Sequence, residues 1–308
     1  MIAAVQRVLV MGVLALAAGW LAWATARGLT WPSGLIVLSM LLLPHALLLA
    51  LEFVLLGCFG RDAATPRASA GQLLRAWWGE VWTALRVFGW WQPFRAGKEP
   101  DRAGRPGQTG VVLVHGFFCN RGIWTPLLRR LAADGHAFTA LTLSPAFGSI
   151  DDGVPAIAEA VTTMRRQTGR APVVVAHSMG GLAVRAWLAS HQADDQLARV
   201  ITIGSPHRGT WLARYAFSVN GRQVRQHSAW LASLASSEPP ARFARFICFF
   251  GHADNIVFPA SNATLPGADN RHLVGVAHVQ MAFHPEVVRC LGAVLARAPP
   301  VVLPVLPG

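Results

Sequence analysis

The sequence predicts an α/β domain, in which a mostly parallel sheet is covered by helices on both faces, preceded by two transmembrane helices and an amphipathic helix. Three observations support this fold class. Two long apolar runs stand near the start of the chain, a tryptophan-rich segment with helical spacing follows them, and short apolar runs then alternate with helical segments. Hydrophobic residues make up 53% of the 308 residues, which exceeds the share typical of a soluble domain.

The two apolar runs cover residues 8–26 and 34–58, and each is long enough to cross a bilayer. Glu52 is the one charged residue within them, and Pro44 predicts a kink in the second run. We therefore predict that residues 1–60 form a membrane anchor of two transmembrane helices.

A signal peptide is the alternative interpretation of the first run. Arg7 precedes the run, and the sequence Ala24-Thr25-Ala26 at its end resembles a cleavage site. The apolar stretch is longer than the usual core of a signal peptide, so we favour two retained spans.

The arginines around the two runs predict their orientation. The connecting loop carries Arg27 alone, whereas Arg7 precedes the first run and Arg61, Arg67 and Arg75 follow the second. The cytoplasmic flanks of membrane helices carry an excess of Lys and Arg. Both ends of the anchor, and the domain that follows it, are therefore predicted to lie in the cytoplasm.

Residues 61–109 are predicted to hold an amphipathic helix and a linker. Within residues 71–92, apolar side chains recur at helical spacing: Leu74, Trp77, Trp78, Val81, Trp82, Leu85 and Phe88. Because Trp and Arg favour lipid headgroups, this helix is expected either along the membrane surface or against the domain that follows. Gly, Pro and charged residues from 96 to 109 are typical of a linker.

The net charge of +12 predicts an acidic partner, and its distribution favours an anionic lipid surface. Residues 61–130 hold 11 Lys and Arg against four Asp and Glu, directly after the predicted anchor. No nucleic-acid-binding motif accompanies the basic residues, so we predict no nucleic acid partner. Four scattered cysteines, without a CxxC or a His/Cys cluster, predict neither a disulfide framework nor a metal site.

The α/β domain is predicted to occupy residues 110–297, before a Pro-rich tail at 298–308. Helices at 122–133 and 154–167 alternate with apolar runs, which is typical of a parallel sheet covered on both faces. The predicted strands are 111–114, 138–143, 172–176, 199–203, 246–250 and 272–276. Residues 211–245 are predicted to form either a small lid or pocket wall, or a packed helical excursion.

Ser178 stands at a sharp turn between a predicted strand and a predicted helix. The apolar run from Val173 to Ala176 precedes it, and glycines at 180 and 181 follow it. A serine hydroxyl is a poor nucleophile, and such a strained turn holds its Oγ where a base and a substrate can both reach it. Position 176 is alanine rather than the more usual glycine, and an ordinary strand-to-helix turn is the alternative. We predict that Ser178 is a nucleophile.

A serine nucleophile also requires donors for the oxyanion that develops on the attacked carbonyl. The first predicted strand ends in His115-Gly116-Phe117. In this architecture the donors are the backbone N–H groups of the residue after the nucleophile and of a residue in the loop after an earlier strand. We therefore predict Phe117 and Met179 as the oxyanion hole. His115 is predicted to brace its loop, because a later histidine is better placed as the base.

The acid and the base are expected after later strands, in the chain order serine, acid, histidine. Asp254 follows the run 246–250 and His278 follows the run 272–276, so we predict Asp254 as the orienting acid and His278 as the general base. Other carboxylates lack a preceding β-rich run or come before the serine: Asp194, Asp195, Asp269, Asp151 and Asp152. The last two are predicted to cap a helix.

Four motifs in this order resemble those of the α/β-hydrolase superfamily, and within it the small bacterial lipases and esterases. They are Ala-His-Ser-Met-Gly-Gly at 176–181, Ile-Gly-Ser-Pro-His-Arg-Gly-Thr at 203–210, Ala-Asp-Asn-Ile-Val at 253–257 and Gly-Val-Ala-His at 275–278. The resemblance covers residues 110 to about 295 and implies an α/β-hydrolase fold.

The resemblance implies a serine hydrolase that cleaves carboxylic esters of acyl chains or lipids through an acyl-enzyme intermediate, without a cofactor. Together with the predicted anchor, it implies an enzyme of a bacterial inner membrane. Acyltransferases, thioesterases and non-catalytic scaffolds share the fold, and these alternatives stay open. The sequence carries no signal for an oligomeric state.

Overall fold

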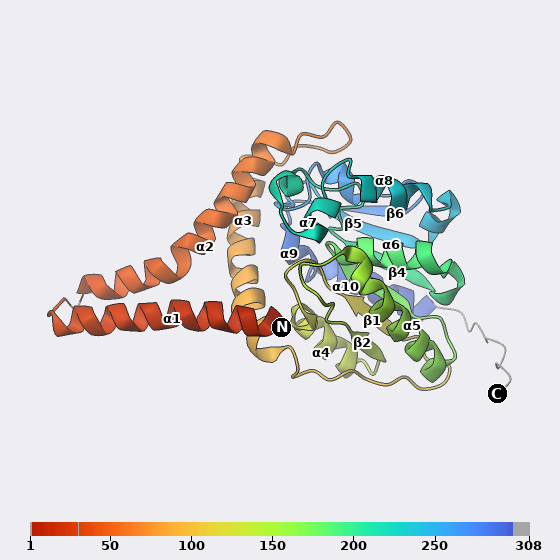
Figure 1. Cartoon of the computed structure of the whole chain (residues 1–308), viewed down its shortest axis with the longest axis horizontal. Helices are drawn as coiled ribbons and strands as arrows, with labels where there is room; N and C mark the ends of the chain where they lie inside the picture. Colours follow the sequence, from red (N-terminus) through yellow and green to blue (C-terminus); the bar gives the residue numbers. More distant parts are fainter. Residues whose placement is uncertain (1, 30, 298–308) are drawn as a thin grey trace.

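The computed structural model describes residues 2–29 and 31–297, and it consists of an α/β domain with a long N-terminal module on one side (Figure 1). We call residues 2–95 the N-terminal module. It contains two long helices, a third helix and a π-helical segment: α1 (Ile2–Ala26), α2 (Trp31–Phe59), α3 (Ala70–Arg86) and η1 (Val87–Arg95). The predicted tail, 298–308, lies outside the described residues.

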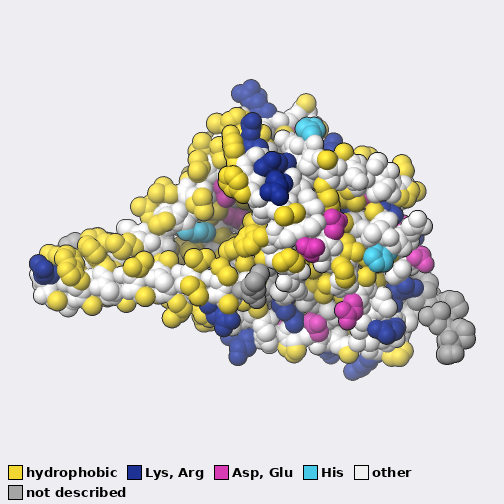
Figure 2. All heavy atoms as spheres, in the orientation of Figure 1, with side chains coloured by type: hydrophobic (Ala, Val, Ile, Leu, Met, Phe, Trp, Pro, Cys, Tyr) yellow, Lys and Arg dark blue, Asp and Glu magenta, His cyan; other side chains and the backbone are white. Residues whose placement is uncertain are grey.

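Helices α1 and α2 are long and apolar enough to cross a membrane, with 25 residues in α1 and 27 in the stretch Ser33–Phe59 of α2. They lie close together near their connecting loop, diverge toward the α/β domain, and carry many apolar side chains on their surfaces (Figure 1 and Figure 2). Only 11% of the most apolar window of α1 and 6% of that of α2 is buried. Both ends of this helical hairpin lie on the side of the α/β domain.

Helix α3 lies between the helical hairpin and the α/β domain (Figure 1). Ser69 and Gln72 form a capping box at its start. The helix predicted for residues 71–92 is present as α3 followed directly by the π-helical segment η1, which contains Pro93 and continues to Arg95. One face of α3 is buried and the other carries exposed Leu74, Trp78 and Trp82.

The α/β domain is built on a six-stranded parallel sheet in the order β2-β1-β3-β4-β5-β6. The strands are β1 (Val111–Val114), β2 (Phe138–Ala140), β3 (Val173–His177), β4 (Arg199–Ile203), β5 (Phe246–Gly251) and β6 (Asp269–Leu273). Because all the strands are parallel, their carboxyl ends meet at one edge of the sheet. This confirms the predicted fold class of a parallel sheet with helices.

Alternate residues along the strands enter two separate cores, one on each face of the sheet. Val112 and Val174 pack on one face with α5 (Val154–Thr168) and α6 (Gly180–His191). Leu113 and Val175 pack on the other face with α4 (Thr125–Ala133) and α10 (Pro285–Arg297). The sheet is therefore covered by helices on both sides, which explains why strands β1, β3 and β5 are nearly continuous apolar runs.

The segment between β4 and β5 forms short helical turns that pack against α6. They are η5 (Trp211–Tyr215), α7 (Val219–Gln223), α8 (Ala229–Ser236) and η6 (Pro240–Arg245). A buried ion pair joins Arg185 of α6 to Glu238, with Arg185 Nη2 2.5 Å from Glu238 Oε2. The segment is thus attached to the domain as a helical excursion, although Tyr215 and Phe217 remain exposed. Further short turns are η2 (Arg121–Trp124), η3 (Ile150–Gly153), η4 (Asp194–Gln196), η7 (Ala260–Ala263) and α9 (His278–Met281).

Two predicted strands differ from the structure, and one predicted cap is present in part. The strand predicted for 272–276 is instead β6, because Gly275 adopts a φ of +67° that ends any extended run. The strand predicted for 138–143 ends at Ala140. Ser149 is the N-cap residue of η3, and of the two predicted aspartates Asp152 completes the capping box by accepting the Ser149 N–H at 2.8 Å.

Candidate active site

Ser178 lies in a strained turn between β3 and α6. Its φ of 56° is in the left-handed region, which non-glycine residues rarely adopt, and its N–H donates to the Ile203 carbonyl at 2.8 Å. Position 180, two residues later, has room only for glycine, because a Cβ on Gly180 would lie 2.6 Å from the His115 carbonyl oxygen. The sequence therefore folds here into the sharp strand-to-helix turn that was predicted for Ser178.

The loop after β1 passes directly beside Ser178. A Cβ on Gly116 would lie 2.6 Å from Ser178 Cβ, so this close approach requires glycine. Among the residues that the structure describes, the backbone N–H groups of Phe117 and Met179 donate to no other protein group. Both N–H groups thus stay available at the turn that holds Ser178, which is what the oxyanion-hole prediction needs.

His115 braces this loop as a neutral side chain. Its Nε2 accepts a hydrogen bond from the Leu143 N–H at 2.9 Å, so Nδ1 carries the proton and donates to the Gly116 carbonyl at 2.8 Å. Burial lowers the pKa of His115 to about 4. Because both ring nitrogens are engaged with backbone groups, His115 is not placed to exchange a proton with a substrate.

Asp254 and His278 form a buried pair after β5 and β6. His278 Nδ1 lies 3.0 Å from both carboxylate oxygens of Asp254, and Asp254 Oδ1 also accepts the N–H groups of Ile256 at 2.9 Å and Val257 at 2.8 Å. Burial lowers the pKa of His278, but the attraction and hydrogen bond of Asp254, together with the charges of Glu80 and Glu52, outweigh burial, so the pKa is raised. The pair fixes the Nδ1–H tautomer of His278 and leaves Nε2 as its basic nitrogen.

His177, the residue before Ser178, contacts His278. Its Nε2 lies 3.2 Å from the His278 carbonyl oxygen, and the two ring centroids are 4.7 Å apart. Burial lowers the pKa of His177 to about 3, so it donates from a neutral ring. Within the described chain, no hydrogen bond joins Ser178 Oγ to His278, and such bonds are often long in unliganded enzymes.

Sequence reasoning missed polar groups that hold these loops from a distance. Asn255 Oδ1 accepts the His278 N–H at 3.1 Å, and Glu80 of α3 accepts the N–H groups of Val279 and Gln280 at 2.7 and 3.1 Å. The signal for Glu80 was present in the sequence, because it is a lone carboxylate in the tryptophan-rich helix.

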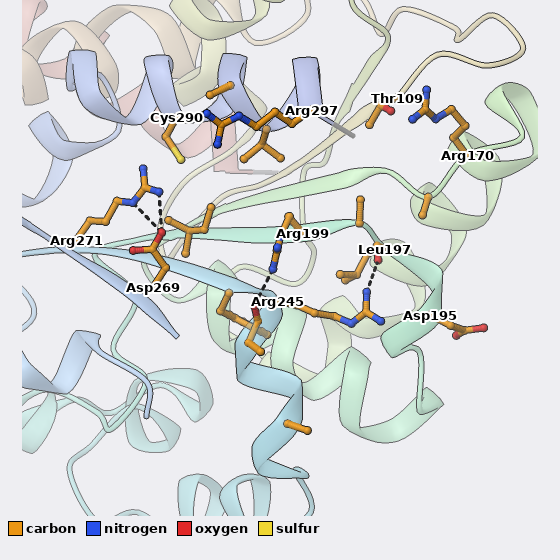
Figure 3. Close-up of a pocket in the computed structure, with 18 residues that line it drawn as sticks. Thr109, Arg170, Asp195, Leu197, Arg199, Arg245, Asp269, Arg271, Cys290 and Arg297 are labelled. Carbon is orange, nitrogen blue, oxygen red and sulfur yellow. Dashed lines mark hydrogen bonds and ion pairs between the residues drawn. The ribbon is translucent and has the colours of Figure 1, made fainter. Parts of the chain in front are cut away.

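An open cavity of the α/β domain lies at the other edge of the sheet. It has a volume of about 1020 Å³ and is lined by residues at the amino ends of β3, β4, β5 and β6, including Arg199, Arg245 and Arg271 (Figure 3). Ser178, Asp254 and His278 do not line it. Across residues 2–29 and 31–297, no group of three or more His, Cys, Asp and Glu side chains is placed to hold a metal ion.

Comparisons with known proteins agree with this architecture. Residues 111–305 match the profile of a family described as the alpha/beta hydrolase family. The mature lipase BlEst2 of Bacillus licheniformis is 19% identical with a TM-score of 0.55, over 64% of this chain and 95% of that chain. Lipase B of Aspergillus fumigatus is 19% identical with a TM-score of 0.56, over 63% of this chain and 54% of that chain. A comparison with curated proteins finds no match.

Proposed function

Since the chain belongs to the alpha/beta hydrolase family, we propose that it is a membrane-anchored serine hydrolase of carboxylic esters, with Ser178, His278 and Asp254 as its triad. One observation carries the proposal. The Asp254–His278 pair lies at the same edge of the sheet as the strained turn of Ser178, with Nδ1 3.0 Å from both carboxylate oxygens. An oriented base beside a serine on a strand-to-helix turn is the arrangement that acyl transfer uses.

In the first half of the reaction, Ser178 Oγ attacks the ester carbonyl carbon while His278 Nε2 takes the hydroxyl proton. Asp254 stabilises the imidazolium that forms. The oxyanion is bound by the N–H groups of Phe117 and Met179, each worth on the order of 3 kcal/mol in comparable sites. The ester C–O bond then breaks, and the imidazolium gives its proton to the leaving alkoxide, which departs as the alcohol.

In the second half, water releases the acyl group from the enzyme. His278 takes a proton from the water as its oxygen attacks the acyl carbonyl carbon, and the same oxyanion hole binds the new intermediate. The bond between the acyl carbon and Ser178 Oγ breaks, Ser178 regains a proton from His278, and the carboxylic acid leaves.

The surroundings of the site support an acyl or lipid ester as the substrate. Phe117 and Phe147 are 43% and 46% exposed beside the oxyanion loop, and their ring centroids are 5.6 Å apart. The edge of the sheet that carries His278 faces the N-terminal module, because α3 packs against α9 (Figure 1). A lipid in a membrane crossed by α1 and α2 is therefore on the same side of the domain as the proposed site.

The arginines around the hairpin support a cytoplasmic position for the domain at a bacterial inner membrane. Three arginines lie near the start of α1 or after the end of α2: Arg7, Arg61 and Arg67. Arg27 is the only basic residue in the loop that connects the two helices. The basic excess in residues 61–130 then lies next to anionic lipid.

Labelling with a fluorophosphonate probe tests this function on the full-length protein in detergent. We expect the wild type to be labelled, and we expect S178A to lose labelling together with about 10⁶-fold of its turnover of p-nitrophenyl acyl esters. The exposed serine variant S233A in α8 makes the same chemical change and is expected to behave like the wild type. Folded wild type that is not labelled, or S178A that keeps its activity, would overturn the proposal in favour of a non-catalytic scaffold.

A further inference from the structure

Glu80 is a fully buried carboxylate that reaches from the N-terminal module into the loop of the predicted base. It lies in α3 and is 1% exposed. Its two oxygens accept hydrogen bonds from the N–H groups of Val279 and Gln280, at 2.7 and 3.1 Å. These are the two residues that directly follow His278. A charged group without water around it is retained only where such donors satisfy it, so this contact is specific.

Close packing brings α3 near enough for this contact. A Cβ on Gly79 would lie 2.0 Å from Gln280 Nε2, so the Gln280 side chain packs directly against the α3 backbone at Gly79. Ala76 and Ala84, one helical turn on each side of Glu80, are also buried. The buried residues of α3 are thus two alanines and Val81 around one carboxylate, and that carboxylate binds the turn 277–281.

A second carboxylate of the N-terminal module reaches the same turn. Glu52 of α2 accepts a hydrogen bond from Asn255 Nδ2 at 2.6 Å, and Asn255 Oδ1 accepts the His278 N–H at 3.1 Å. The N–H groups of three successive residues, 278 to 280, are thus all bound by Asn255 or Glu80. The backbone of His278 is held by groups that depend on α2 and α3.

We propose that Glu80 is a positioning residue for the esterase reaction proposed above: it holds the turn of His278 so that Nε2 meets the Ser178 hydroxyl. The inference rests on the proposed function. In this proposal, α3 helps to position the base of the active site and also connects the domain to the predicted membrane anchor. Small displacements of a base from its reacting partner cost rate rather than binding, so the effect is expected in kcat.

The charge of Glu80 predicts a second measurable effect, a change in the pH dependence of kcat/KM. The groups that face His278 are Asp254, Glu80, Glu52 and His177. Burial raises the pKa of Glu80 to about 7, and its ionised form raises the pKa of His278. His278 must be neutral to act as a base. Replacing Glu80 by neutral Gln is therefore expected to lower the pKa of His278 and to move the acid limb of kcat/KM to lower pH.

The test compares wild type, E80Q and the exposed control E159Q of α5, each as the full-length protein in detergent. We expect E80Q to lose about 10- to 100-fold in kcat with KM changed less than about threefold, because a misplaced base slows the chemical step. We also expect its acid limb to move to lower pH, and E159Q to match the wild type. An unchanged kcat together with an unmoved acid limb in E80Q overturns the proposal.

If thermal unfolding shows that E80Q does not fold, the kcat of E80D is measured to test the proposal instead. It keeps the charge but is one methylene shorter and does not reach both N–H groups, so a reduced kcat is expected and a wild-type kcat overturns the proposal. Failure of the proposed function looks different, because the wild type itself would then not be labelled by the fluorophosphonate. Wild-type labelling with an equal rate in the folded Glu80 variant rejects the role of Glu80 alone.

Discussion

The two edges of the sheet differ in what surrounds them. At the carboxyl ends of the strands, Ser178, Asp254 and His278 are buried; hydrogen bonds hold Asp254 to the backbone of its own loop and join the backbone of His278 to Asn255. At the amino ends lies the large arginine-lined cavity, where Arg199 and Arg245 donate to backbone carbonyls at 2.7 and 3.4 Å (Figure 3). Loops that turn at the carboxyl ends of parallel strands bring reactive groups together, whereas the size of a void reflects how side chains pack.

The strongest test of this difference between the two edges makes the same substitution, Asp to Asn, at each edge. D254N is expected to lower kcat about 10⁴-fold, because an asparagine favours the wrong tautomer of His278. D269N makes the same change at the start of β6, where Asp269 forms an exposed ion pair with Arg271, and its kcat is expected to stay within about twofold. Rates of p-nitrophenyl ester hydrolysis measure both. Equal losses in the two variants would mean that the reaction does not belong to the carboxyl edge.

Steric crowding distinguishes the edges as well. G116A places a methyl group where only 2.6 Å separates it from Ser178 Cβ, so the oxyanion loop must move away, and we expect a loss of about 100-fold in kcat. G292A is the matched control in α10, beside the amino-edge cavity, because no atom lies within 4 Å of its new Cβ. Its activity is expected to equal that of the wild type. Wild-type activity in G116A would contradict the assigned place of the oxyanion loop.

The parts of the site that depend on local sequence could be predicted. Local sequence determines the backbone conformation of three segments: the apolar run before Ser178, the paired glycines after it, and the strand that precedes Asp254. His278 follows the last strand as the first residue of α9, although that strand ends three residues earlier than expected, because Gly275 turns the chain. Chain order and strand ends carry this information, and both are readable without a structure.

Contacts between distant segments could not be predicted in the same way. Glu80 meets Val279 across 199 positions of the chain, and nothing in the spacing of the tryptophans indicates which turn the helix packs on. The same holds for Gln6, which lies near the start of α1 and meets Phe118 across 112 positions. Side chains that hold a catalytic loop from another part of the chain become visible only when the packing is known.

Replacement of Gln6 is expected to lower kcat least among these variants. It tests whether α1 helps to hold the loop after β1 at the carboxyl edge of the sheet. Its Nε2 donates to the Phe118 carbonyl at 3.0 Å and to Gln92 Oε1 at 3.2 Å, and Gln92 Oε1 in turn accepts the Asn120 N–H at 2.8 Å. Phe118 has a left-handed φ of 54°, so its backbone depends on neighbours that fix it.

Q6A removes the donor to the Phe118 carbonyl and one of the two donors to Gln92 Oε1, and we expect kcat to fall about three- to tenfold because the adjacent Phe117 N–H becomes less well placed. Q196A makes the same change in η4 near the amino-edge cavity and is expected to leave kcat unchanged. The rate of fluorophosphonate labelling gives an independent reading, since it too depends on the oxyanion hole. If Q6A and Q196A react at the same rate, α1 does not help to hold the loop of Phe117 and Phe118.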